Sequence, residues 1–178
     1  MKKSILIVIA FFGLLNFVKA QTKTIWIVRH AEKQMDDTKN SNPPLSKIGL
    51  ERAEDLRKLL KGKKVDYLFS TSYLRTQQTV LPISKERNIA IQDYKVNDKA
   101  FIENLNNLPA NSNVIIVGHS NTIIPLAKDL GAKILLDQLT DEDYDFIFEL
   151  KIKDAKVKTS IKHYGASHHS SNKILAIN

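Results

Sequence analysis

The chain has 178 residues, of which 43% are hydrophobic and 26% charged, as expected for a globular domain with its own core. It contains no cysteine, which excludes disulfides, thiolate metal sites and a cysteine nucleophile. The formal net charge is +8, but the lysines are spread along the chain and no aromatic residues alternate with them. We therefore expect no nucleic-acid partner, and the excess charge favours small anionic molecules.

The N-terminal 20 residues have the pattern of a secretory signal peptide. Lys2 and Lys3 precede an apolar stretch from Ile5 to Val18, which ends in the small-residue pattern that signal peptidase cuts. The stretch is shorter than the about 20 residues of a membrane span, and an uncleaved anchor is the alternative. We expect a periplasmic or secreted mature chain that starts near Gln21, has a net charge of +5 and is not inserted in a membrane.

After residue 21, strand and helix patterns alternate. Strands are expected at 24–28, 65–69, 89–93 and 114–117, helices at 45–61, 72–87, 99–108 and 121–130, and an antiparallel strand pair at 146–152 and 156–164. This order predicts an α/β fold, a three-layer α/β/α sandwich with a mostly parallel sheet and an antiparallel C-terminal edge. We expect a single domain over residues 21–165 and a polar, loose tail over 166–178.

Three features mark the expected helix ends. Ser46 is placed to cap the first helix and Gly62 to end it. Thr71 or Ser72 is placed to cap the second helix. Pro82 lies inside that helix, where a kink or break is expected.

Two histidines directly follow two of the expected buried strands. Arg29 and His30 end the first strand, His119 ends the strand at 114–117, and Arg75 follows the strand at 65–69. Because the carboxyl ends of parallel strands meet at one edge of the sheet, where ligands bind, we expect these four side chains to share a site.

This set of side chains fits the transfer of a phosphoryl group. A neutral imidazole is a nucleophile toward phosphorus, and two guanidinium groups can hold the phosphoryl oxygens with paired hydrogen bonds. A second imidazole, if protonated, and backbone N–H groups at the helix starts after Ser72 and Ser120 would add stabilisation of negative charge. Such a site requires no metal ion, and we expect neither a metal nor a cofactor.

Four segments, in order, resemble the motifs of the histidine phosphatase superfamily, which has the phosphoglycerate-mutase-like fold. They are VRHAEK at 28–33, PLSKIG at 44–49, STSYLRTQQT at 70–79 and VGHS at 117–120. Ala31 stands where the family usually has glycine, and the RHAEK form is similar to that of small bacterial members.

The resemblance implies a catalytic role for each of four residues. His30 would be the nucleophile that becomes phosphohistidine, and Arg29 and Arg75 would bind the phosphoryl oxygens. His119 would complete the pocket and stabilise the transition state. The implied activity is that of an exported, metal-independent phosphatase that hydrolyses phosphate monoesters or similar phosphorylated substrates.

Three further residues are expected to bind substrate. The resemblance places Ser120 and Asn121 in the pocket lining, chiefly through backbone N–H groups. Glu32 and Lys33, close to His30, are either substrate contacts or partners in a local ion pair. The expected ligands are a small phosphorylated substrate or inorganic phosphate, whereas the natural substrate and the oligomeric state stay open.

The sequence does not identify the residue that donates a proton to the leaving group. Glu103 lies 28 residues beyond Arg75, an offset that fits the acid of larger family members, but a solvent-facing helix residue is the preferred interpretation. The resemblance to small members such as phosphohistidine phosphatases implies the alternative, a site without a dedicated acid.

Two polar clusters near the C-terminus are assigned no site. Residues 141–145 (DEDYD) are interpreted as a solvated turn, rather than a rim element or a metal site. His163, His168 and His169 are interpreted as parts of a loose tail, rather than a zinc site, because adjacent histidines are poorly spaced ligands and no carboxylate stands beside them.

Three other functions were compared with the phosphatase. A serine hydrolase would use Ser120 in GHSNT, but Thr122 replaces the second glycine of the G-x-S-x-G turn. A catalytically weak module that binds or senses phosphoesters in the cell envelope is the main alternative. A mutase would need a larger lid than the short inserts provide.

Overall fold

The computed structural model describes residues 21–170, so the expected signal peptide and the last eight residues lie outside the described part. The elements in chain order are β1 (Lys23–Arg29), α1 (Lys47–Leu59), β2 (Tyr67–Ser70), α2 (Leu74–Arg87), β3 (Ile91–Asp93), α3 (Lys99–Asn107), β4 (Asn113–Gly118), α4 (Ile123–Asp129), β5 (Phe146–Lys153) and β6 (Lys156–His163). Among residues 21–170, no helix has both the length and the apolar character needed to cross a membrane.

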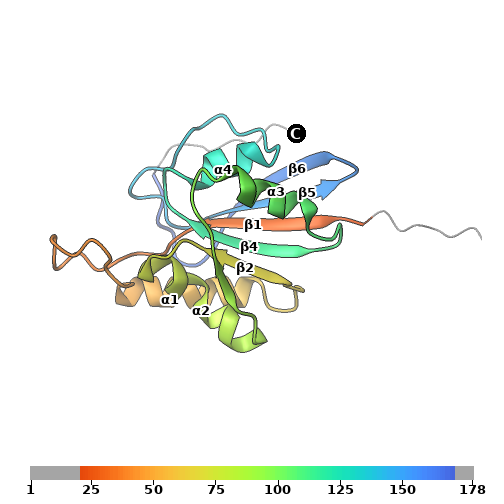
Figure 1. Cartoon of the computed structure of the whole chain (residues 1–178). Coiled ribbons are helices and arrows are strands. Elements are labelled where there is room, and N and C mark those ends of the chain that lie inside the picture. The colour runs from red at the N-terminus through yellow and green to blue at the C-terminus, as the bar shows by residue number, and fades with distance from the viewer. Residues whose placement is uncertain (1–20, 171–178) are drawn as a thin grey trace, which may run out of the picture.

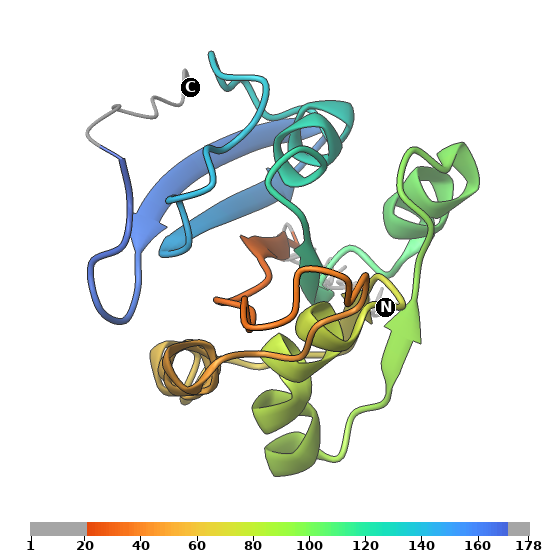
Figure 2. The same cartoon turned by 90° about the vertical axis from the view of Figure 1, so that its left-hand side faces the viewer.

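The sheet is covered by helices on both faces (Figures 1 and 2). Because side chains alternate along a strand, Ile25 and Ile27 of β1 join the core shared with α3 and α4. Trp26 and Val28 point to the other face and join the core shared with α1 and α2. The predicted three-layer α/β/α sandwich is confirmed.

The strand order is β3-β2-β4-β1-β5-β6. The four strands β1 to β4 are parallel, whereas β5 pairs antiparallel with β1 and β6 antiparallel with β5. Asp154 and Ala155 make the turn between β5 and β6 with positive φ angles of 50° and 59°, as a tight two-residue hairpin turn requires. The predicted antiparallel edge is therefore confirmed.

The first helix begins as the sequence predicts, and the second does not. Ser46 caps α1 by accepting the backbone N–H of Gly49 at 3.2 Å. The prediction that Thr71 or Ser72 caps α2 is wrong, because the helix begins after Tyr73 and the N–H of Leu74 donates to Asn42 Oδ1 at 2.8 Å. A side chain from the distant loop after β1 thus supplies the cap.

The helix α2 also continues through Pro82 without a break. The helix α4 is shorter than predicted and starts at Ile123, after Thr122. Gly131 follows it with a φ of +94°, a conformation that glycine adopts without strain.

The segment after β6 is held against the domain as far as Ser170. Arg52 donates from Nη1 to the carbonyl oxygens of Tyr164 and Ala166 at 3.0 and 2.9 Å. His168 donates its backbone N–H to Asp145 Oδ2, and Ser170 donates its own to Asp143 Oδ1. The prediction of a loose tail is wrong for residues 166–170, because buried carboxylates take up its polar groups.

The interpretation of residues 141–145 as a solvated turn is wrong for two of its acids. Asp143 and Asp145 are only 2% and 1% exposed. Asp141 and Glu142 are exposed. Buried carboxylates need hydrogen-bond donors, and the segment after β6 provides several of them.

The close approach of α1 to the loop after β1 yields a stability prediction. A Cβ at position 49 would lie 2.1 Å from the carbonyl oxygen of Glu32. Gly49→Ala should therefore lower the free energy of unfolding by about 1–3 kcal/mol, although alanine has the higher intrinsic helix propensity by about 1 kcal/mol. Urea denaturation measures the change. Glu51→Ala, at an exposed position of the same helix, should stay within about 0.5 kcal/mol of wild type.

Candidate active site

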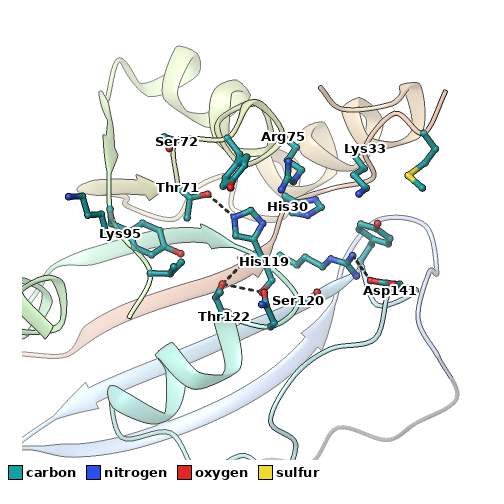
Figure 3. A pocket seen from close by; sticks show the side chains of 17 residues that line it. His30, Lys33, Thr71, Ser72, Arg75, Lys95, His119, Ser120, Thr122 and Asp141 are labelled. Atoms are coloured by element: carbon teal, nitrogen blue, oxygen red, sulfur yellow. Dashed lines mark hydrogen bonds and ion pairs between the residues drawn. The ribbon is translucent and has the colours of Figure 1, made fainter. Parts of the chain in front are cut away.

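One pocket of about 930 Å³ opens at the carboxyl ends of the parallel strands. The pairing of β1 with β4 sets Arg29 opposite Gly118, so the residues that follow, His30 and His119, leave the sheet side by side. Their ring centroids lie 5.4 Å apart. Figure 3 shows His30, His119 and Arg75 around the same space. They come from three different elements: His30 follows β1, His119 follows β4, and Arg75 lies in the first turn of α2.

His30 is held by two bonds that fix its position and its tautomer. Its backbone N–H donates to the Gly118 carbonyl at 2.9 Å, which extends the β1–β4 pairing by one residue. Its Nδ1 lies 2.8 Å from the Ala31 carbonyl oxygen. A carbonyl oxygen only accepts, so Nδ1 carries the proton and Nε2 of the neutral ring keeps its lone pair.

The charge state of His30 follows from its surroundings. Burial lowers its pKa to about 3, and the positive charges of Arg29 and Arg75 act in the same direction, against the bond to the Ala31 carbonyl. The imidazole is therefore neutral at physiological pH. This is the state in which a histidine acts as a nucleophile.

His119 is also neutral in the ligand-free pocket. Burial, and then the charges of Arg75 and Arg29, lower its pKa to about 4. Its Nε2 shares a 3.0 Å hydrogen bond with Thr71 Oγ1, and its backbone N–H donates to Thr122 Oγ1 at 3.0 Å. The ring is thus oriented toward the pocket from both sides.

Arg29 is held mainly by neutral groups. Its Nη1 donates to the carbonyl oxygens of Thr140 and Asp143 at 2.7 and 3.3 Å, and its guanidinium lies 3.9 Å from the centre of the Tyr144 ring. The carboxylate of Asp141 is exposed and 3.7 Å from Nη2. Most of the positive charge is therefore left for a ligand.

Arg75 has a similar environment. Its guanidinium lies 4.3 Å from the centre of the Tyr73 ring. The Nε atoms of Arg29 and Arg75 are both buried and have no hydrogen-bond partner among residues 21–170. Unpaired buried donors are costly, and the two guanidinium groups that line this pocket give it the charge of an anion site.

All seven site residues predicted from the sequence line this pocket. Ser120, Asn121 and Lys33 stand at its rim with the four catalytic candidates. The structure thus brings together every predicted position, and the individual roles of the residues stay predictions.

The motif residues around the site connect its segments to one another. Gln78 accepts the N–H of Leu45 at 2.7 Å, which ties α2 to the loop before α1. Thr79 accepts the N–H of Ala31 at 2.9 Å and donates to the Arg75 carbonyl at 2.7 Å. The side chain of Thr79 therefore holds the nucleophile's loop and the second arginine together.

Glu32 is not among the residues that line the pocket, and its ion pair is made with α1 rather than within its own loop. It is buried and pairs with Arg52, whose Nη2 lies 2.7 Å from Glu32 Oε1. His168 Nδ1 lies 2.8 Å from the same oxygen. Sequence reasoning missed Arg52, which looks like an ordinary surface residue of an amphipathic helix.

Other pocket residues were not recognised as such from the sequence. Thr71 was considered only as a helix cap, although it bonds to His119. Tyr73 and Tyr144 lie against the two arginines, and Asp141 stands at the rim. The position of Tyr73 between Ser72 and Arg75 could have indicated that it lines the pocket. For Tyr144, the sequence offers no such indication apart from its acidic neighbours.

Two alternatives lose support from this geometry. Glu103 on α3 is not among the residues that line the pocket, so the structure does not place it as a proton donor. The His119 ring bonds to Thr71 and not to Ser120, so Ser120 lacks the base that a serine nucleophile needs.

Comparison with known proteins agrees with the motifs. The model of the histidine phosphatase superfamily (branch 1) matches residues 25–99, from β1 to the start of α3. This range contains Arg29, His30 and Arg75. No curated protein matches the chain.

Solved structures share the fold. They include an alpha-ribazole phosphatase from Shigella flexneri (15% identity, 84% of this chain and 100% of that chain covered, TM-score 0.61). The protein histidine phosphatase SixA complexed with tungstate is 17% identical, with 79% and 95% covered and a TM-score of 0.60. A mycobacterial glucosyl-3-phosphoglycerate phosphatase complexed with inorganic phosphate is 13% identical, with 81% and 97% covered and a TM-score of 0.58. The matched family model over residues 25–99, the four motifs in register and the shared fold make the chain similar to the histidine phosphatase superfamily.

Proposed function

We propose that this protein is a metal-independent phosphatase that hydrolyses phosphate monoesters through a phosphohistidine intermediate on His30. The observation that carries the proposal is that two guanidinium groups, those of Arg29 and Arg75, line the pocket of a neutral histidine. The guanidinium groups fit the oxygens of a phosphoryl group, and the lone pair of His30 Nε2 fits its phosphorus.

In the first step, His30 Nε2 would attack phosphorus and the bond from phosphorus to the ester oxygen would break. The guanidinium groups of Arg29 and Arg75 would bind the non-bridging oxygens, on which the charge of the transition state is spread. The proton stays on Nδ1 and keeps its hydrogen bond to the Ala31 carbonyl, which stabilises the positive charge that develops on the ring. The leaving oxygen takes a proton from water or from a neighbouring group.

In the second step, water would attack the same phosphorus and the bond to Nε2 would break. The products are inorganic phosphate and the neutral His30, ready for another turn. The arginines hold the phosphoryl oxygens in both steps, so one set of contacts serves the formation and the hydrolysis of the intermediate.

His119 is expected to change its charge when the substrate binds. The positive charges that lower its pKa in the free pocket are neutralised by a bound dianion. The ring then gains a proton and donates a charge-assisted hydrogen bond to the phosphoryl group.

The structural relatives support a phosphorylated ligand. One is complexed with tungstate and another with inorganic phosphate, both tetrahedral oxyanions. Lys33 and Lys95 add positive charge to the wall of this pocket, and Tyr73 and Tyr144 add aromatic surface. We infer a small phosphorylated substrate that fills part of a roomy pocket.

We also propose that the protein is exported, on the basis of the signal-peptide pattern in the N-terminal 20 residues. Expression of the full chain in a bacterial host should yield a periplasmic or secreted form whose N-terminus is Gln21. Mass spectrometry of the intact protein from each fraction measures this. Recovery of uncleaved chain in the membrane fraction would show instead that the segment is an anchor.

The catalytic proposal predicts turnover of an aryl phosphate by purified protein in the presence of a chelator. His30→Ala should abolish turnover, because no other group takes the place of the nucleophile. Arg75→Lys should lower kcat/KM by about 10²–10³-fold, since a lysine keeps the charge but loses the paired donors. Steady-state kinetics measure both effects.

Two controls accompany these kinetics. Ser120→Ala should retain most of the turnover, which separates the phosphatase from a serine hydrolase. Rapid quenching with a labelled substrate should trap phosphate on His30 in an acid-labile, base-stable form. A folded wild-type protein that binds phosphate but turns over no phosphoester would favour the alternative of a binding or sensing module.

The charge analysis predicts the titration of both histidines by NMR. In the free protein, His30 and His119 should titrate with pKa values of about 3 and about 4, so both rings are neutral at physiological pH. Arg75→Met should raise the pKa of both rings, because Arg75 is one of the charges that lower them. Saturating inorganic phosphate should raise the pKa of His119 for the same reason. Lys33→Met removes another pocket charge that does not contribute to these shifts, and it should leave both pKa values in place.

A further inference from the structure

A second cluster of ligand-type side chains lies outside the pocket. Asp145 precedes β5, His163 ends β6 and His169 belongs to the segment after β6. One carboxylate oxygen and one ring nitrogen from each histidine lie within 4.8 Å of one another. We propose that Asp145, His163 and His169 bind a divalent transition-metal ion of the zinc type.

The fold brings these residues together by three independent contacts. The pairing of β5 with β6 sets Phe146 opposite His163, and the Tyr164 N–H donates to the Asp145 carbonyl at 2.9 Å. The chain then turns back, and the His168 carbonyl accepts the N–H of Tyr144 at 2.9 Å. His169 is thereby set beside Asp145 from the opposite side.

The distances fit a metal site. His163 Nδ1 lies 3.0 Å from Asp145 Oδ1, and His169 Nδ1 lies 2.6 Å from Asp145 Oδ2. Ligand atoms of a tetrahedral zinc ion lie about 3.3 Å apart, as its bond lengths of about 2.0–2.1 Å require. Both Asp145–histidine pairs are shorter than this, so the side chains would move slightly apart to admit an ion.

The ligand types also fit. Two imidazoles and one carboxylate suit zinc and neighbouring divalent metals, whereas magnesium and calcium prefer oxygen ligands throughout. Asp145 Oδ2 also accepts the backbone N–H of His168 at 3.1 Å, a contact of the kind that orients a ligating carboxylate.

The burial pattern leaves the cluster accessible. The Asp145 side chain is 1% exposed, while those of His163 and His169 are 48% and 33% exposed. The carboxylate of Asp145 thus lies on the inner side of the cluster, and solvent can complete the coordination on the outer side.

The His168–His169 pair is informative here. The two rings point to different partners, because His168 Nδ1 is directed at Glu32 and His169 Nδ1 at Asp145. Their adjacency in the sequence is therefore no obstacle to ligation by one of them. The carboxylate that the sequence lacks beside them is supplied by Asp145, 24 positions before His169.

The site would fasten the segment after β6 without taking part in the reaction. Asp145 follows Tyr144, whose ring lies against Arg29 and 5.0 Å from the His168 ring. An ion bound by Asp145, His163 and His169 would therefore stabilise a wall of the pocket, and turnover at His30 would not depend on it.

Zinc titration of tag-free, chelator-treated full-length protein tests the proposal. We expect one zinc ion per chain by calorimetry, and an increase in Tm of about 5–10 °C at a hundredfold excess of zinc over Kd. His163→Ala and His169→Ala should each weaken zinc binding by more than about a hundredfold, since even outer-shell changes cost about 10–100-fold. Both positions are partly exposed, so both variants should fold, which circular dichroism checks.

Two matched variants test the location of the site. His168→Ala removes the neighbouring imidazole, and His119→Ala removes one from the pocket; each should keep the affinity for zinc. The absence of zinc binding by the wild-type protein, or an unchanged affinity in His169→Ala, would overturn the proposal. So would a loss of zinc in His119→Ala, which would move the ion to the pocket.

Discussion

The parallel pairing of β1 with β4 is the constraint on which the pocket depends. Its register sets Arg29 opposite Gly118, and the His30 N–H continues the pairing to the Gly118 carbonyl. The two strands are far apart in the sequence, but they end at the same level of the sheet edge, so the histidines that follow them lie side by side. Gly118 cannot be larger, because a Cβ there would lie 2.7 Å from the Tyr94 hydroxyl and 2.8 Å from Ile123.

The pocket keeps its positive charge because its arginines are held by neutral groups. Arg29 bonds to two carbonyl oxygens and an aromatic face, and Arg75 lies against another aromatic face. Arg52 provides the contrast, since the carboxylate of Glu32 neutralises it in a bidentate pair. An arginine side chain thus remains free to bind an anion where its partners are neutral dipoles. It has a structural role where its partner is a carboxylate.

Local patterns in the sequence were enough to predict the sandwich and the four catalytic candidates, whereas Ser120 and Asn121 were predicted from the family resemblance. Buried strands appear as short apolar runs, and the residue after each run marks the sheet edge, which is how His30 and His119 stand out. Contacts between distant segments leave no such periodicity. The cap of α2 by Asn42, the pairing of Glu32 with Arg52 and the packing of Tyr144 on Arg29 depend on the folded chain, and so the sequence did not reveal them.

The polar segment after β6 shows why composition misled the prediction there. A stretch of serines and histidines cannot bury apolar surface, so a loose tail is the ordinary expectation. In this protein, the buried groups are the hydrogen-bond acceptors. Asp143 and Asp145 lie inside the domain, and their carboxylates need donors. Ser170 and His169 supply them, at 2.8 and 2.6 Å. The Asp143 carbonyl also accepts a hydrogen bond from Arg29. The segment after β6 and the pocket therefore both depend on the position of the loop before β5, so a change in the conformation of the segment would shift a wall of the pocket.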